Sequence, residues 1–276
     1  MGDERPLEDR LIHRNEEGVV RITLNAPDAG NALSADMRDR LTEVFEEASG
    51  DMAVRSVLLR AAGERHFCTG AALGGQRPSV ERPDGAPDPA VGDAARTIRN
   101  GWQRLIAAIL DCEKPVVAAV NGTAAGGGAH LALACDLILM ADSAKFVEVF
   151  VRRGIIPDAG GAYLLPRLVG LHRAKELMFL GDEVSAAHAD RIGLVNRVVP
   201  LAELERESDA LATRLAEGPT RAIALTKWLL NRSLDSSRQT CFEDEAVAQE
   251  LASATEDCRE GVASFIERRD PDFKGW

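Results

Sequence analysis

Several residue types that mark particular functions are scarce in this sequence of 276 residues. Aromatic side chains make up 4% of it, and no cluster of Lys or Arg stands out against a formal net charge of -11. Nucleic-acid-binding domains carry a basic surface and often stack bases on aromatic rings, so we expect no nucleic-acid partner. No apolar run approaches the roughly 20 residues of a membrane-spanning helix, so we expect no membrane span.

The few cysteines and histidines lack the spacing of a metal site. The cysteines are Cys68, Cys112, Cys135, Cys241 and Cys258. None forms a CxxC pair, which is typical of reduced thiols in a cytoplasmic protein and not of disulfides or zinc. The charged N-terminal stretch also lacks the apolar centre of a signal peptide. We therefore expect a cytoplasmic protein that holds no metal.

What the chain does contain is an alternation of strand and helix patterns up to about residue 200. Strands are expected at 19–24, 54–60, 115–120, 137–141, 146–151 and 193–199. Helical patterns lie between them, as at 34–45, 93–113, 162–180 and 184–192, which predicts an α/β sheet. From residue 201 onward every pattern is helical. We therefore divide the chain into an α/β core at 1–200 and a helical region at 201–276, which is a separate layer or an assembly element.

Two stretches break this alternation. Residues 74–92 are rich in proline and glycine and predict a long loop, which is often functional and could serve as a lid. Residues 121–130 (NGTAAGGGAH) follow an apolar strand and hold four glycines in seven positions. Such a turn, entering a helix, leaves N–H groups free to hold negative charge, although a buried packing turn explains the glycines equally well.

A second glycine-bearing turn, at 67–73, also follows a strand. Backbone N–H groups from two such turns can converge on one oxygen, which is the geometry of an oxyanion hole. Neither turn has the spacing of a dinucleotide-binding or Walker A loop.

Taken together, the motifs resemble the crotonase superfamily, the enoyl-CoA hydratase/isomerase family. The match runs from about residue 10 to the end of the chain. Its motifs are 25–27 (NAP), 31–33 (NAL), 67–73 (FCTGAAL), 114–122 (KPVVAAVNG), 126–128 (GGG), 134–136 (ACD), 154–161 (GIIPDAGG), 260–265 (EGVASF) and 269–273 (RDPDF).

The resemblance implies a spiral of ββα units with a helical C-terminal region used for trimerisation, and a homotrimer or homohexamer. It implies acyl-CoA thioesters as substrates, with coenzyme A entering as part of the substrate and no other cofactor. The thioester oxygen would lie between the N–H groups of Ala71 and Gly127, stabilising an enolate. The residues expected to contact the substrate are Ala72, Leu73, Gly126, Phe150 and Gly161.

The chain departs from the family pattern where hydratases carry two catalytic glutamates. His130 stands at the first position, and counting back from Pro157 places Phe150 at the second. Glu148 is two residues away and would lie on the opposite side of a strand if that stretch is extended. His130 could donate to the substrate or act as a second acid or base, or it could simply be satisfied by a backbone partner.

Asp158 matches the aspartate that isomerases of the family use to move a proton. Phe150 together with the Pro-Asp-x-Gly-Gly motif resembles the enoyl-CoA and ring-epoxide isomerases of phenylacetate degradation. An aspartate after a proline is also a common helix N-cap or Asx turn, which is the alternative role.

The resemblance therefore favours an enzyme that shifts the double bond of an enoyl-CoA, with Asp158 as acid and base and His130 as an auxiliary. One alternative is a hydratase that adds water from a site rebuilt with Asp158 and His130. Another is a catalytically weak protein that binds acyl-CoA. The acyl group and the pathway stay open, because fatty-acid metabolism, aromatic degradation and secondary metabolism all fit.

Overall fold

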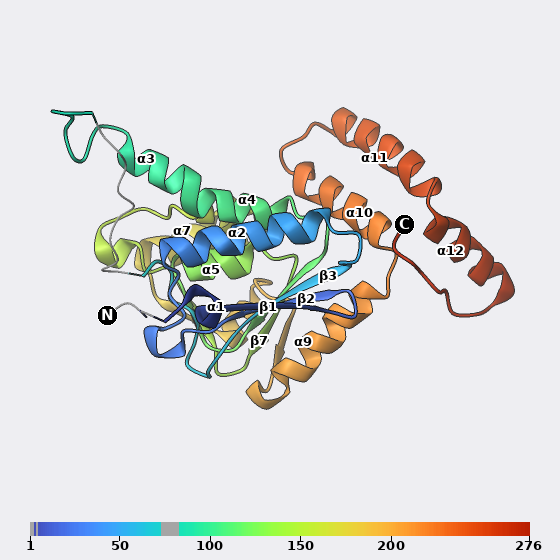
Figure 1. Cartoon of the computed structure of the whole chain (residues 1–276), viewed down its shortest axis with the longest axis horizontal. Helices are drawn as coiled ribbons and strands as arrows, with labels where there is room; N and C mark the ends of the chain where they lie inside the picture. The colour runs from blue at the N-terminus through green and yellow to red at the C-terminus, as the bar shows by residue number, and fades with distance from the viewer. Residues whose placement is uncertain (1–2, 4, 73–82) are drawn as a thin grey trace.

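Two β-sheets form the centre of the protein, and the chain passes repeatedly from one to the other (Figure 1). The computed structural model describes residue 3, residues 5–72 and residues 83–276. The six-stranded sheet has the order β1-β2-β3-β5-β7-β10, and the four-stranded sheet has the order β4-β6-β8-β9. Pairing is parallel in both sheets except between β1 and β2 and between β8 and β9.

The strands are short. They are β1 Leu11–Glu16, β2 Val19–Leu24, β3 Ser56–Ala61, β4 His66–Cys68, β5 Val116–Val120, β6 Thr123–Ala125, β7 Leu137–Ala141, β8 Lys145–Val147, β9 Glu183–Ser185 and β10 Arg197–Val199. Every residue of β5 is buried. A strand that is apolar throughout is typical of a parallel sheet covered on both faces, and β5 lies at the middle of the larger sheet.

Helices connect the strands and form the C-terminal region. They are α1 Leu7–Arg10, α2 Ala35–Gly50, α3 Asp93–Ile98, α4 Arg104–Leu110, α5 Gly127–Leu133, α6 Gly161–Val169, α7 Leu171–Leu180, α8 Ala186–Arg191, α9 Leu201–Ala216, α10 Thr220–Ser233, α11 Arg238–Ser253 and α12 Glu256–Glu267. Short η turns are Pro27–Ala29 (η1), the π-helical Arg99–Gln103 (η2) and Val151–Arg153 (η3). One strand in each sheet and then a helix, as in β5-β6-α5, is the ββα unit that the family resemblance implied.

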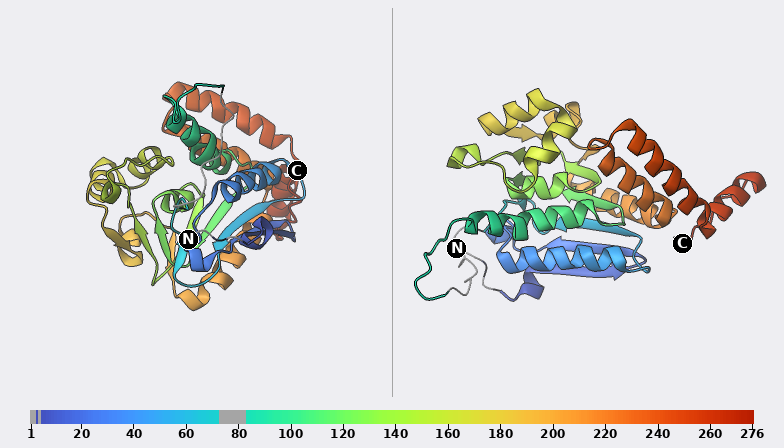
Figure 2. Two further views of the ribbon diagram at one scale, coloured as in Figure 1. Left: turned by 60° about the vertical axis from the view of Figure 1, so that its left-hand side comes forward. Right: turned by 90° about the horizontal axis from the view of Figure 1, so that it is seen from above.

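The C-terminal helices divide into two groups. Helix α9 packs against β3, β5 and β7 and so covers one face of the larger sheet. Helices α10, α11 and α12 project from one end of the molecule (Figures 1 and 2). Exposed apolar side chains on these three helices include Trp228, Leu230, Phe242, Val247, Leu251, Val262, Phe265 and Ile266. The part of the chain that the structure describes contains no helix long and apolar enough to cross a membrane.

Some expected elements differ in the structure. The 146–151 stretch is not one strand, because β8 ends at Val147 and the chain then turns into η3. The expected helix at 184–192 begins with β9, and the expected strand at 193–199 shortens to β10. Strands β1, β4 and β6 were missed; β1 is mostly exposed, and the other two have three residues each. Such segments carry no readable apolar alternation.

Candidate active site

The two glycine-bearing turns lie side by side. Strands β4 and β6 pair in parallel, with Cys68 opposite Ala124, so the turns that follow them leave the sheet at the same edge. A Cβ atom placed on Gly70 would lie 3.3 Å from the backbone nitrogen of Gly127. The segment containing Ala71 therefore meets the first residue of α5.

The backbone of these turns leaves the N–H groups of Ala71 and Gly127 without a partner in the neighbouring segments that the structure describes. Leu33 donates to the Gly70 carbonyl over 2.8 Å and accepts from the Ala72 N–H over 3.0 Å. Because N–H directions alternate along an extended segment, the Ala71 N–H between them points away from Leu33. Gly127 is the first residue of α5, where N–H groups have no acceptor within the helix. These two N–H groups can serve one anionic oxygen.

Glycine is required here because the backbones nearly touch. A Cβ atom on Gly128 would lie 2.1 Å from the carbonyl oxygen of Cys68, and one on Gly127 would lie 2.8 Å from the indole of Trp102. Contacts this close do not occur between real Cβ atoms and their neighbours. The glycines thus let α5 begin directly against β4 and beneath Trp102.

His130 lies three residues further along α5 and is completely buried. Its Nε2 atom is 3.1 Å from both carboxylate oxygens of Glu148. The imidazole stacks on the Phe150 ring, with 5.2 Å between centroids and 13° between planes. Its Nδ1 atom has no hydrogen-bond partner among the described residues. Among the described residues no backbone group is recorded as a partner of the His130 ring, and the side chain within hydrogen-bond distance of it is Glu148.

Glu148 reaches His130 because the chain turns after β8. The Val149 N–H donates to the Val147 carbonyl over 3.1 Å, so the backbone is not extended across Glu148. Alternation of side chains along a strand ends there, and both Glu148 and Phe150 contact His130. The expectation that Glu148 lies on the far side is wrong for this reason, and no sequence pattern announced the turn.

Asp158 is half-buried in the turn that leads into α6. The N-cap position of α6 belongs to Gly160 and carries no side-chain capping bond, so Asp158 does not cap this helix. Burial raises the pKa of the Asp158 carboxyl, whereas a hydrogen bond from its own backbone N–H and the charge of His130 act in the opposite direction. The site thus holds a carboxylate that is partly removed from water and lies within electrostatic range of the imidazole.

Gly126 and Gly161, two of the remaining expected residues, lie against this cluster. A Cβ atom on Gly161, the first residue of α6, would lie 2.0 Å from Nε2 of His130. Gly126 adopts a φ of +55° next to the Phe150 ring. Ala72 is half-buried beside Ala71, and Leu73 lies outside the described residues. The structure therefore brings Gly126, Phe150 and Gly161 together around His130.

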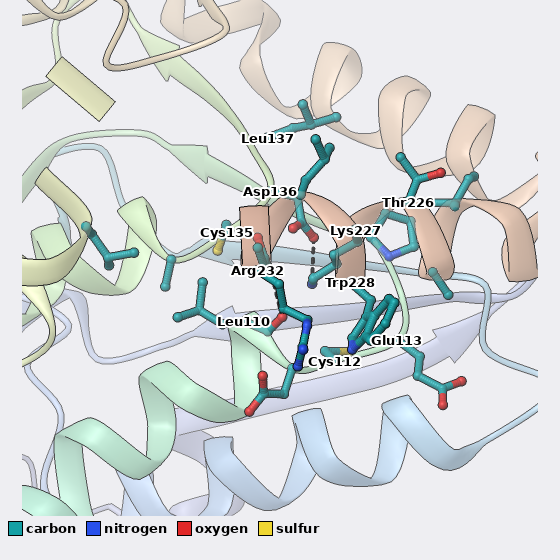
Figure 3. Close-up of a pocket in the computed structure, with 18 of the residues that line it drawn as sticks. Leu110, Cys112, Glu113, Cys135, Asp136, Leu137, Thr226, Lys227, Trp228 and Arg232 are labelled. Carbon is teal, nitrogen blue, oxygen red and sulfur yellow. Dashed lines mark hydrogen bonds and ion pairs between the residues drawn. The ribbon is translucent and has the colours of Figure 1, made fainter. Parts of the chain in front are cut away.

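A cavity of about 1390 Å³ lies away from this cluster, between α10 and the core (Figure 3). It touches the C-terminal part of α5 at Leu133. Nearby, the Lys227 ammonium lies 2.8 Å from the Asp136 carboxylate and also donates to the Ile109 and Lys114 carbonyls. Burial raises the pKa of Asp136, and Lys227 opposes that rise. No pattern in the sequence indicated this buried pair.

The cysteines and possible metal ligands add no further chemistry. Cys68 and Cys135 are buried, as expected of small core residues, and burial raises the pKa of the Cys68 thiol to about 12. Thiols with raised pKa values are poor nucleophiles at neutral pH. Within the described residues, no three His, Cys, Asp or Glu side chains are grouped so that they could hold a metal ion.

Comparison with known proteins agrees with this geometry. The model of the enoyl-CoA hydratase/isomerase family matches residues 14–276. The protein named "Probable enoyl-CoA hydratase" from Rhodobacter capsulatus is 39% identical over 259 residues, covering 94% of this chain and 95% of that protein. The 1,2-epoxyphenylacetyl-CoA isomerase of Escherichia coli is 38% identical over 265 residues, covering 96% and 98%.

Solved structures give the same result. The crystal structure of enoyl-CoA hydratase from Bacillus anthracis superposes with a TM-score of 0.85 at 34% identity, covering 97% of this chain and 100% of that one. The expected crotonase-like fold is thereby confirmed. This chain belongs to the enoyl-CoA hydratase/isomerase family of enzymes.

Proposed function

We propose that this enzyme moves the double bond of an enoyl-CoA thioester, with Asp158 as the single acid and base. The observation that carries the proposal is the position of this half-buried carboxylate. It is free of a capping role and is the group that the family resemblance assigns to proton transfer. Of the two relatives described above, one is named as a probable hydratase and the other as an isomerase, so the acid and base groups decide between the two reactions.

The reaction follows from the two kinds of group. The N–H groups of Ala71 and Gly127 donate to the thioester oxygen and stabilise the negative charge that develops on it. Asp158 takes a proton from the α carbon of a 3-enoyl-CoA, so that the C–H electrons form a dienolate. The same carboxyl then returns a proton to the γ carbon, which leaves the double bond between the α and β carbons. A carboxylate of raised pKa is suited to both steps.

The residues at the two hydratase positions support isomerisation over hydration. Hydration requires a water molecule held by two acid or base groups, which the family places at the positions of His130 and Phe150. Here those two rings stack on one another, and Nε2 of His130 is already in contact with Glu148. This arrangement leaves Asp158 as the carboxyl available to substrate.

The test is to incubate the protein with 3-enoyl-CoA and 2-enoyl-CoA and to follow bond migration and hydration separately. We expect migration with little hydration. The Asp158→Asn variant should lose about 10²- to 10⁴-fold in kcat, the contribution typical of an acid–base group. Asp190→Asn, an exposed carboxyl on α8, is the matched control and should keep full activity.

The alternatives give different outcomes. Faster hydration than migration would replace the isomerase with a hydratase that uses Asp158 and His130. Binding of acyl-CoA without turnover would indicate a protein that has kept the oxyanion hole alone. Full isomerase activity in Asp158→Asn would remove Asp158 as the base.

We further propose a homotrimer or homohexamer, in which region 201–276 mediates contact between subunits. Support comes from the exposed apolar side chains of α10, α11 and α12, because an apolar surface of this kind marks interfaces. Sedimentation of the full chain should give three or six copies, and Phe265→Asp should weaken that assembly. A monomer at micromolar concentration would contradict this proposal.

A further inference from the structure

Trp102 and Ile106 lie four residues apart on the continuous helix that η2 and α4 form. Side chains with this spacing are neighbours on one face of a helix. A Cβ atom on Gly127 would lie 2.8, 2.9 and 3.0 Å from three carbons of the Trp102 indole. A Cβ atom on Gly160 would lie 3.1 Å from Cγ2 of Ile106. The indole therefore packs against the start of α5, and Ile106 packs against the turn before α6.

These two contacts lie at opposite ends of the proposed reaction. Gly127 carries one of the N–H groups proposed to bind the thioester oxygen, and Gly160 comes two residues after Asp158, the proposed base. An acyl group must pass between these two turns if its oxygen is bound at the first and its α and γ carbons reach the second. The helix face made of Trp102 and Ile106 contacts both turns, so it borders the acyl carbons.

We propose that Trp102 is a specificity-determining residue, whose indole limits the bulk of the acyl group between its thioester carbon and its γ carbon. The β carbon lies midway along this stretch, so the enzyme selects acyl groups that carry no branch there. The inference rests on the proposed function, because that function places the acyl group between the two turns.

The surrounding structure keeps the indole in place. Trp102 belongs to the π-helical turn Arg99–Gln103, and turns of this kind are frequent at functional sites. Its side chain is buried, as is that of Ile106. On the neighbouring Gly101, a Cβ atom would lie 2.5 Å from Cζ of Arg38, which belongs to α2. Because the helix is packed this closely against α2, the indole cannot move aside to admit a branch.

The first test measures binding, so it requires no reaction. Calorimetric titration of the full chain compares butanoyl-CoA with 3-methylbutanoyl-CoA, two saturated thioesters that differ by one methyl group on the β carbon. One carbon more or less in an apolar pocket changes discrimination by roughly 10- to 200-fold, so butanoyl-CoA should bind at least about tenfold more tightly. Equal affinity for the two thioesters would overturn the inference, and that result needs no variant to fold.

The second test removes the indole. Trp102→Ala should reduce the preference to less than about threefold, while the affinity for free coenzyme A should change by less than about twofold. A general loss of structure would instead weaken the binding of all three ligands. Trp102→Leu, a milder truncation, should give an intermediate preference and serves if the alanine variant does not fold. An unchanged preference in either folded variant would also overturn the inference.

Phe179→Ala is the matched control. Phe179 is an exposed aromatic residue on α7, and its truncation should leave the preference as it is in the unaltered protein.

Turnover separates this inference from the proposed function. The pair 3-butenoyl-CoA and 3-methyl-3-butenoyl-CoA should show the same preference in kcat/KM, and Trp102→Ala should reduce it. If neither thioester isomerises but the binding preference holds, the proposed function fails and the role of Trp102 stands. If both isomerise and bind equally well, the role of Trp102 fails and the proposed function stands.

Discussion

The candidate site has two halves, one made of backbone N–H groups and the other of side chains. The half proposed to bind the thioester oxygen consists of backbone N–H groups, positioned by glycines that leave no room for a Cβ atom. The half proposed to transfer protons consists of side chains from α5, from the turn after β8 and from the turn before α6. The first half depends on how closely two chain segments approach, and the second depends on how a few side chains are oriented. Substitutions that add a Cβ atom should therefore lower stability in the first half and turnover in the second.

The largest effect is expected at the backbone half, from Gly128→Ala. The new Cβ atom would lie 2.1 Å from the Cys68 carbonyl oxygen, and backbone atoms cannot rotate away. We expect a loss in unfolding free energy at or above about 3 kcal/mol, the upper part of the usual overpacking range, together with loss of activity. Denaturant unfolding and turnover measure both.

Gly50→Ala is the matched control for this substitution. Gly50 is the last residue of α2, and a Cβ atom there would meet nothing within 4 Å. Its stability should be unchanged or slightly higher, because alanine favours helix over glycine. Equal stability of Gly128→Ala and Gly50→Ala would mean that the close approach of α5 and β4 is not required.

A smaller effect is expected at the side-chain half, from Gly161→Ala. The added Cβ atom would lie 2.0 Å from Nε2 of His130, so the imidazole must shift away from Glu148. We expect kcat to fall by about 10²-fold, the loss that a misplacement of about 1 Å can cause, while the protein stays folded. Wild-type kinetics with a displaced His130 would show that the position of the ring is unimportant.

The smallest effect is expected from pH, because the ionisation of Asp158 should change both the activity and the stability of the protein. Because burial raises its pKa in the folded state, activity should rise with pH through a value above the ordinary aspartate pKa of about 3.9. In that same interval the folded protein binds more protons than the unfolded chain, so stability should fall as pH increases. Above the interval the ionised carboxylate remains a cost to folding.

Asp158→Asn separates these two contributions. It should abolish the rise in activity while leaving the melting temperature at pH 7 equal to or above that of the unaltered protein. A clear fall in melting temperature would instead assign Asp158 a structural role, such as a hydrogen bond that the folded state requires.

This contrast also explains what the sequence could predict. The glycine turns and the buried strand β5 could be predicted, because glycines and uninterrupted apolar runs mark tight turns and buried strands within short stretches of sequence. The positions of Ala71 and Gly127 followed from those turns through the family resemblance. The contact between Glu148 and His130 could not be predicted. It depends on a turn after β8, whereas the alternating apolar pattern of residues 146–151 indicates a continuous strand. The pair between Lys227 and Asp136 joins residues far apart in the sequence, and neither residue type predicts burial.

The buried position of Lys227 has a consequence for shortening the chain. Helix α10 brings this ammonium to a carboxylate that belongs to the core, and Asp136 also accepts the N–H of Val116 at the start of β5. Deleting the projecting helices from residue 220 onward would leave Asp136 without its cation and two carbonyls without their donor. Proteolytic removal of the C-terminal arm should thus loosen the central strand as well as any contact between subunits.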